Sequence, residues 1–297
     1  MKRIDIHAHA VAFPELTPKH RYTGERFLSA DELIAMYERF GIDRGVLLPI
    51  VSPEAQCFPM TSEGACALAR QYSEHFSWFC NVDPRAVDHS PSSDLGYLLE
   101  HYKNLGARGV GEVTANLYAD DARMENLFAS AAALGLPVLI HIAPHEGGLY
   151  GIIDELNLPR IEKILKKYPD LTLIGHSQPF WSEISTDNTD EIRNGYPKGK
   201  VTEGRIAKLM REYPGLCCDL SAGSGCNALT RDPDYAAGFL TEFADRIFYG
   251  CDICASFNDH PARLNAFLDS LAESGALSRG TYEKICHGNA ERLLGLN

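Results

Sequence analysis

The sequence has no apolar run that approaches about 18 residues, the length a helix needs to cross a bilayer. Its first residues lack the charged segment and apolar core of a secretory signal, so we expect a cytoplasmic location. Basic residues are scarce: 28 Lys and Arg stand against 40 Asp and Glu, which gives a net charge of −12. This balance argues against a nucleic acid or an anionic membrane as the main partner.

The nine cysteines show no disulfide pattern, because their number is odd and they are scattered along the chain. We expect free thiols in a reducing compartment. The pair Cys251 and Cys254 has the C-x-x-C spacing, but it lacks a thioredoxin-like context or a second pair. We interpret these two as plain thiols. The hydrophobic content of 45% is typical of a soluble globular protein with a sizeable core.

Short apolar segments alternate with segments of helical periodicity along the 297 residues. Such alternation indicates βαβ units and a parallel sheet. We predict eight strands, around residue 5 and at 44–50, 76–82, 107–113, 137–142, 171–174, 216–220 and 246–250. Eight units fit a single (β/α)8 TIM barrel domain over residues 1–297. The alternative, a doubly wound open sheet, would have a Gly-rich phosphate loop after the first strand, where this chain has histidines.

Several predicted connections are longer than a tight turn. Residues 11–28, 83–93 and 178–200 are expected to be extended loops at the mouth of the barrel, and long loops in compact domains are usually functional. The run Ser221-Ala-Gly-Ser-Gly225 is expected to be a flexible mouth loop.

The first predicted strand ends in His7 and His9. Side chains two apart on a strand point the same way, so both imidazoles can face one divalent metal ion. A lone H-x-H is weak evidence, but the other strand ends carry similar residues. Glu112 ends the fourth strand, His141 the fifth, His176 the sixth, and Asp252 follows the eighth. In a barrel these ends converge on one face, so we predict a metal site there.

These motifs resemble the amidohydrolase superfamily, specifically amidohydrolase family 2. The resemblance covers the whole chain. It rests on D-I-H-A-H, L-P-V-L-I-H ending in His141, L-I-G-H ending in His176, Y-G-C-D with Asp252, and G-N-A-E-R-L-L-G-L at 288–296. One departure is Cys251, where the family usually has Ser or Thr.

The resemblance implies a metal held by His7, His9, His141 and Asp252, with His176 as a ligand or a base. The G-V-G-E that ends in Glu112 resembles a strand of the superfamily's DNase branch, where that Glu bridges two metals. One ion would then take His7, His9, Glu112 and Asp252, and the second would take Glu112, His141 and His176. In decarboxylase-like members one metal suffices, and Glu112 would be a buried, salt-bridged carboxylate.

The function that follows is hydrolysis of an amide, lactone or ester of a small molecule by a metal-activated water. Asp252 would accept the water proton, and His176 would share that role or stabilise the oxyanion. Zn²⁺ is favoured as the cofactor, although Mn, Fe and Co also fit such ligands.

Two other functions compete with hydrolysis. One is metal-dependent decarboxylation or hydration of a small carboxylic acid, in which Arg193 would hold the carboxylate. The other is a non-catalytic metal-bound scaffold, which ranks last because the ligands lie at an open barrel mouth. Asn116, Gln178, Trp181 and Arg193 are candidate substrate-binding residues, and a homodimer is expected by analogy with relatives.

Overall fold

The computed structural model describes residues 2–20, 23–55 and 60–296. Within them, eight parallel strands form two sheets, ordered β1-β2-β3 and β4-β5-β7-β8-β9. The strands are β1 (Ile4–Ala8), β2 (Arg44–Leu47), β3 (Phe76–Trp78), β4 (Val110–Val113), β5 (Val138–Ala143), β7 (Leu173–His176), β8 (Leu216–Asp219) and β9 (Ile247–Phe248). A short β6 (Ile152–Ile153) pairs with β5 outside this order.

Two seams close the sheets into a barrel. At the β3–β4 seam, the backbone N–H of Cys80 donates to Gly109 O at 2.9 Å, and Cys80 bridges Val110. At the β9–β1 seam, Ile6 N donates to Tyr249 O at 3.1 Å. The predicted (β/α)8 barrel is therefore confirmed.

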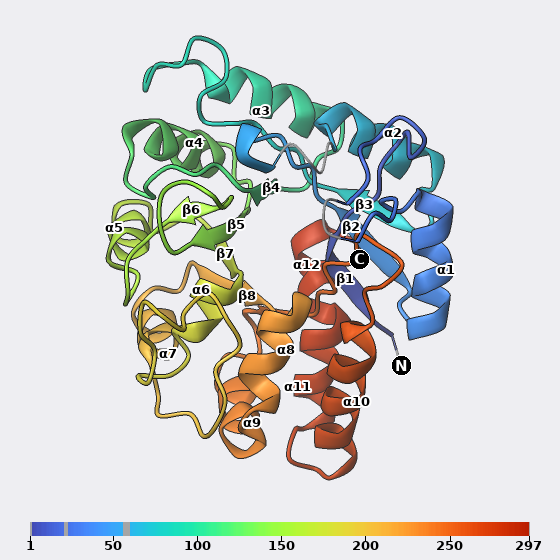
Figure 1. The fold of residues 1–297 in the computed structure, drawn as a ribbon, viewed down its shortest axis with the longest axis vertical. Coiled ribbons are helices and arrows are strands. Elements are labelled where there is room, and N and C mark those ends of the chain that lie inside the picture. Colours follow the sequence, from blue (N-terminus) through green and yellow to red (C-terminus); the bar gives the residue numbers. More distant parts are fainter. Residues whose placement is uncertain (1, 21–22, 56–59, 297) are drawn as a thin grey trace.

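Helices surround the ring of strands (Figure 1). They are α1 (Ala30–Phe40), α2 (Ser62–Gln71), α3 (Leu95–Asn104), α4 (Ala122–Ala133), α5 (Pro159–Lys167), α6 (Gln178–Ser182), α7 (Arg205–Glu212), α8 (Ala222–Thr230), α9 (Pro233–Glu242), α10 (His260–Glu273), α11 (Arg279–Glu283) and α12 (Asn289–Leu294). The helix α1 begins as its sequence predicts, with a capping box between Ser29 and Glu32, and Gly41 ends it in the left-handed conformation. No helix among the described residues is long and apolar enough to cross a membrane.

Alternation along the strands divides the core into two layers. One set of side chains fills the barrel interior, including Ile4, Val46 and Leu139. The intervening residues, such as Leu47 and Ile140, face the helices. Side chains on this same face that lie nearer the carboxyl ends of the strands therefore point into the barrel mouth, where the candidate site lies.

Two strands break this alternation at functional positions. In β1 the register with β2 shifts between Asp5 and Ala8, and in β4 the register with β5 shifts between Val110 and Val113. Each shift adds one residue to the strand, which is the signature of a β-bulge. The bulge in β1 explains how His7 faces the barrel interior although it directly follows Ile6, which also does.

Three expectations on loops and helices need correction. The predicted loop 178–200 begins with a helical turn, α6. The run from Ser221 to Gly225 is no flexible loop, because α8 begins at Ala222. The segment 281–294, whose periodicity predicts one continuous helix, is divided by a π-helical turn, Lys284–Gly288. Of the predicted connection 11–28, residues 21 and 22 lie outside the described residues.

Candidate metal centre

The strand ends bring together all six predicted ligand residues. They form two groups whose potential ligand atoms lie within 4.8 Å of one another, one of His7, His9 and Asp252, the other of Glu112, His141 and His176. The residues come from β1, β4, β5, β7 and the segment after β9. Five segments far apart in the sequence therefore contribute to one constellation at the barrel mouth.

Glu112 and Asp252 each place a carboxylate oxygen near both histidines of β1. Oε2 of Glu112 lies 3.5 Å from Nε2 of both His7 and His9. Oδ1 of Asp252 lies 3.7 Å from Nε2 of His7 and 3.3 Å from Nε2 of His9. Ligands at about 2.0–2.1 Å from a tetrahedral zinc ion are about 3.3 Å apart, so each of these four contacts is close to the separation of two ligands on one ion.

The second group adjoins the first through Glu112. Nδ1 of His141 donates to Oε1 of Glu112 at 2.7 Å, while the other oxygen of this carboxylate faces His7 and His9. The rings of His141 and His176 are 5.3 Å apart. Glu112 is 3% exposed, so its carboxylate lies between two sets of nitrogen atoms with little access to water. A bridging position between two ions is compatible with this arrangement.

Hydrogen bonds at Nδ1 leave Nε2 free to bind a metal in three of the imidazoles. Nδ1 of His9 donates to Leu48 O at 3.0 Å. Nδ1 of His7 and Nδ1 of His176 both donate to Asp219. Nε2 of His7 is buried and makes no hydrogen bond. A buried nitrogen atom without a hydrogen-bond partner is costly unless a cation or a donor occupies the adjacent space, which again fits a metal.

Asp219 is the functional residue that the sequence analysis missed. It ends β8 and is fully buried. Ser221 supports it, with its hydroxyl 2.7 Å and its backbone N–H 3.1 Å from Oδ1. Asp219 lies at the end of the predicted strand 216–220, so the reasoning that identified Glu112 at the end of its strand would have identified Asp219 too.

The charges of the constellation shift the pKa values of its members. Burial alone would lower the pKa of His9, but its hydrogen bonds to Asp252 and Glu112 outweigh burial and raise the pKa to about 9. Burial would raise the pKa of Glu112, yet the charge of His7 and hydrogen bonds from the imidazoles hold it well below its usual range. The carboxylates are therefore ionised, and a metal would displace protons from the imidazoles.

Asp252 is held in an unusual backbone conformation. Its φ is +53°, in the left-handed region that non-glycine residues rarely adopt. Its N–H donates to His7 O at 2.7 Å. Its side chain is 27% exposed, the most exposed carboxylate of the constellation, so it lies where a substrate would enter.

The four candidate substrate-binding residues differ in their contacts and in their exposure. Asn116 bonds the β5–β6 loop, donating to Gly151 O at 3.1 Å and accepting from Gly147 N at 2.6 Å. Trp181 is buried and donates through Nε1 to Asp219 O at 3.0 Å. These contacts hold other segments of the chain, and the substrate role of Asn116 and Trp181 stays a prediction.

Arg193 and Gln178 differ in exposure. Arg193 is fully buried, donates to Glu155 O at 3.3 Å, and lies 3.7 Å from Oδ1 of Asp190. In the described part of the chain it forms no ion pair with the metal-binding residues. Gln178 is half-buried two residues after His176, and its Nε2 donates to Tyr196 Oη at 3.4 Å. Gln178 thus stays a candidate for contact with substrate.

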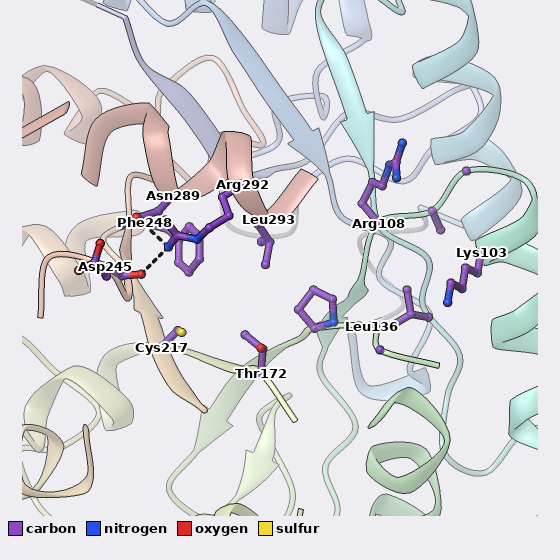
Figure 2. Close-up of a pocket in the computed structure, with 14 residues that line it drawn as sticks. Lys103, Arg108, Leu136, Thr172, Cys217, Asp245, Phe248, Asn289, Arg292 and Leu293 are labelled. Atoms are coloured by element: carbon purple, nitrogen blue, oxygen red, sulfur yellow. Dashed lines mark hydrogen bonds between the residues drawn. The ribbon is translucent and has the colours of Figure 1, made fainter. Parts of the chain in front are cut away.

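A hollow of about 620 Å³ lies at the end of the barrel opposite the constellation. Figure 2 shows the residues that line it. Arg108, Leu136 and Thr172 line it just before β4, β5 and β7, and Arg292 of α12 donates there to Asp245 O and Asn289 Oδ1. No histidine is among its described lining residues. Because the active sites of such barrels lie at the carboxyl ends of the strands, we do not assign the reaction to this hollow.

The fold and this constellation define a metal-dependent enzyme class, and the comparisons identify the family. The family model for amidohydrolases matches residues 4–296, so the chain belongs to the amidohydrolase family. No curated protein matches the sequence.

Solved structures share the barrel over nearly their whole length. An amidohydrolase from Burkholderia multivorans with bound zinc is 17% identical, with a TM-score of 0.65 and 99% of each chain covered. A putative 2-pyrone-4,6-dicarboxylic acid hydrolase from Pseudomonas putida is 15% identical, with a TM-score of 0.63 and coverage of 99% of this chain and 98% of that one. 5-Carboxyvanillate decarboxylase from Sphingomonas paucimobilis is 16% identical, with a TM-score of 0.60 and 99% of each chain covered. At these identities the likeness establishes the fold.

Proposed function

We propose that this chain is a hydrolase that uses two divalent ions, with zinc favoured, to cleave an amide, lactone or ester bond of a small molecule. The observation that carries the proposal is the position of Glu112. One of its oxygens is 3.5 Å from Nε2 of both His7 and His9, and the other accepts from His141. A carboxylate with nitrogen ligands on both sides is suited to bridge two ions.

Charge supports two ions over one. Glu112, Asp219 and Asp252 contribute three carboxylates to the constellation, and Asp219 is fully buried. One divalent ion would leave this pocket negative once the imidazoles have lost their protons. Buried charge without a counter-charge is costly, and a second ion would balance it. We therefore favour the two-metal reading of the site.

The side chains of the chain have separate roles in the reaction. A divalent ion at such a site lowers the pKa of bound water to about 7 and polarises a substrate carbonyl. Asp252 is the proposed acceptor of the water proton, because its carboxylate is partly exposed and Oδ1 is 3.3 Å from Nε2 of His9. Oδ2 of Asp252 is 3.9 Å from Nε2 of His176, so the two side chains flank the same space.

Decarboxylation is the alternative, because similar barrels include decarboxylases as well as pyrone hydrolases. That reading needs a cation near the site for the substrate carboxylate, and Arg193 was the predicted one. Its guanidinium instead lies near Glu155 O and Asp190. We therefore rank hydrolysis first.

The test is metal content together with substitution of ligands. Protein purified without chelator is expected to hold about two equivalents of metal, measured by elemental analysis. His7→Ala, His141→Ala and Asp252→Asn are expected to abolish metal-dependent hydrolysis in a screen of lactones, esters and amides. His101→Ala, which changes an exposed helical histidine, is the matched control. A single equivalent with release of CO2 from aromatic acids would favour the decarboxylase, and full activity in any ligand variant would contradict the site.

A further inference from the structure

The carboxylate of Asp219 contacts one imidazole from each group of metal ligands. Oδ2 accepts from Nδ1 of His7 at 2.7 Å, and Oδ1 accepts from Nδ1 of His176 at 3.0 Å. His7 belongs to the group with His9 and Asp252, His176 belongs to the group with Glu112 and His141, and a third group joins both histidines to Asp219. The rings of His7 and His176 lie 4.4 Å apart in front of this carboxylate. One buried side chain thus accepts hydrogen bonds from both groups of candidate ligands.

We infer that Asp219 is a positioning residue shared by two metal subsites, so that metal binding at both depends on this single carboxylate. The inference rests on the two-metal form of the proposed function. It goes further by assigning the coupling between the subsites to a residue that is not itself a ligand.

The chemistry of hydrogen bonding explains why one carboxylate can serve both rings. An ionised carboxylate only accepts hydrogen bonds, so each imidazole that faces it carries its proton on Nδ1. Nε2 then presents a lone pair to the metal. Nε2 of His7 lies 3.5 Å from Oε2 of Glu112, and Nε2 of His176 lies 3.9 Å from Oδ2 of Asp252. Both lone pairs therefore point into the constellation.

Contacts around Asp219 keep its carboxylate in this orientation. The hydroxyl of Ser221 donates to Oδ1 at 2.7 Å, and this hydroxyl also lies 2.9 Å from Nδ1 of His176 and 3.2 Å from Nδ1 of His7. Nε1 of Trp181 fixes the backbone by donating to Asp219 O. The carboxylate cannot rotate toward one imidazole without losing contact with the other or with Ser221.

The variant Asp219→Asn separates a shared role from a merely structural one. An amide has one accepting and one donating end, so it can hold only one imidazole with its proton on Nδ1. The imidazole that faces the NH2 group must accept there, which places its proton on Nε2, where the metal would bind. We expect two tightly bound zinc ions per chain to fall to one, with the other affinity lowered about 10- to 100-fold. Asp219→Ala has no acceptor, and we expect it to weaken both sites.

The measurement is equilibrium dialysis of the full chain against Zn²⁺ buffered by a competing chelator, with thermal melting in chelator as the check on folding. Asp154→Asn is the matched control, because Asp154 is also fully buried but accepts from backbone N–H groups, among them Arg160 and Ile161, rather than from imidazoles. It is expected to retain two equivalents. His141→Ala removes a ligand from one group and is expected to retain one.

The outcomes distinguish this inference from the proposed function. Two tightly bound ions in both the wild type and Asp219→Asn would overturn the inference and leave the two-metal hydrolase intact. One ion in the wild type would overturn the two-metal proposal, and the inference with it. If the Asp219 variants do not fold, Ser221→Ala keeps the carboxylate and removes its hydroxyl donor. We expect severalfold weaker binding at both subsites in that variant, and unchanged binding at both would reject the shared role.

Discussion

The backbone N–H of Asp252 donates to the carbonyl oxygen of His7 at 2.7 Å. The candidate ligand nearest the C-terminus is therefore bonded to one of the two nearest the N-terminus. The bond lies at the β9–β1 seam, which is continued by His9 N donating to Ile253 O at 3.1 Å. The hydrogen bonds that close the barrel at this seam therefore also hold the segments of His7, His9 and Asp252 together.

Metal is accordingly expected to stabilise the closed barrel. An ion that binds the folded chain at a free concentration of 100 times its Kd adds about 2.7 kcal/mol, which raises Tm by several degrees in a domain of this size. Calorimetry with and without added Zn²⁺ measures the shift. His7→Ala, which removes a ligand from the seam, should abolish most of it, and an equal shift in this variant would place the stabilising ion elsewhere.

Gly111 is expected to tolerate no side chain. Its φ is +147°, and a Cβ there would lie 2.8 Å from Leu139 O and 3.0 Å from Leu139 Cβ. We expect Gly111→Ala to lower the free energy of unfolding by about 2–4 kcal/mol and to weaken metal binding, because the neighbouring Glu112 would move. Chemical denaturation and zinc dialysis measure the two effects. Gly135→Ala is the control: its φ of +64° is strained but a Cβ there has free space, so about 1 kcal/mol is expected.

The positions of the strands were predictable because each combines an apolar run with a turn or helix signal. The candidate metal ligands were predictable for the same reason, since Glu112, His141 and His176 lie at or near the carboxyl ends of apolar runs. The bulge in β1 was not, because nothing in its residues marks a register shift, whereas in β4 the isolated Gly111 is a general signal for a bulge. Strict alternation from Ile6 would have turned His7 toward the helices.

The directions in which loop side chains point could not be predicted from the sequence either. Arg193 and Asn116 are polar residues in predicted mouth loops, and polarity there suggested contact with substrate. In the structure their side chains donate to backbone carbonyl oxygens of other segments, Arg193 to Glu155 O and Asn116 to Gly151 O. Such partners are distant in sequence, and only the tertiary fold brings them into contact. Asp219 differs, because its place at a strand end could be predicted from the sequence. Only its hydrogen bonds to two histidines could not be predicted without the fold.

Asn116 is expected to order the β5–β6 loop. Besides Gly147 and Gly151, its side chain bonds His145 O at 3.3 Å. Asn116→Ala leaves these groups without a partner, so we expect faster hydrogen exchange and proteolysis at residues 144–151, with zinc content unchanged. Asn227→Ala, which removes a single bond to Pro197 O in another loop, should leave this segment protected. Unchanged exchange at Gly147 would show that these hydrogen bonds do not order the loop.

Arg85 joins the segments that follow β2 and β3, because its guanidinium donates to both Asp83 and Glu54. Burial would raise the pKa of Asp83, but the hydrogen bonds from Arg85 outweigh it and lower the pKa; the same contacts lower the pKa of Glu54. Carboxyl groups with lowered pKa contribute stability above about pH 4 and lose it as the pH falls further. Arg85→Met should therefore cost about 2 kcal/mol at pH 7, and the difference from the wild type should shrink toward pH 3 in urea denaturation. Arg279→Met, at an exposed pair with Glu283, should cost almost nothing at either pH, and a difference for Arg85→Met that did not depend on pH would exclude the two carboxylates as its cause.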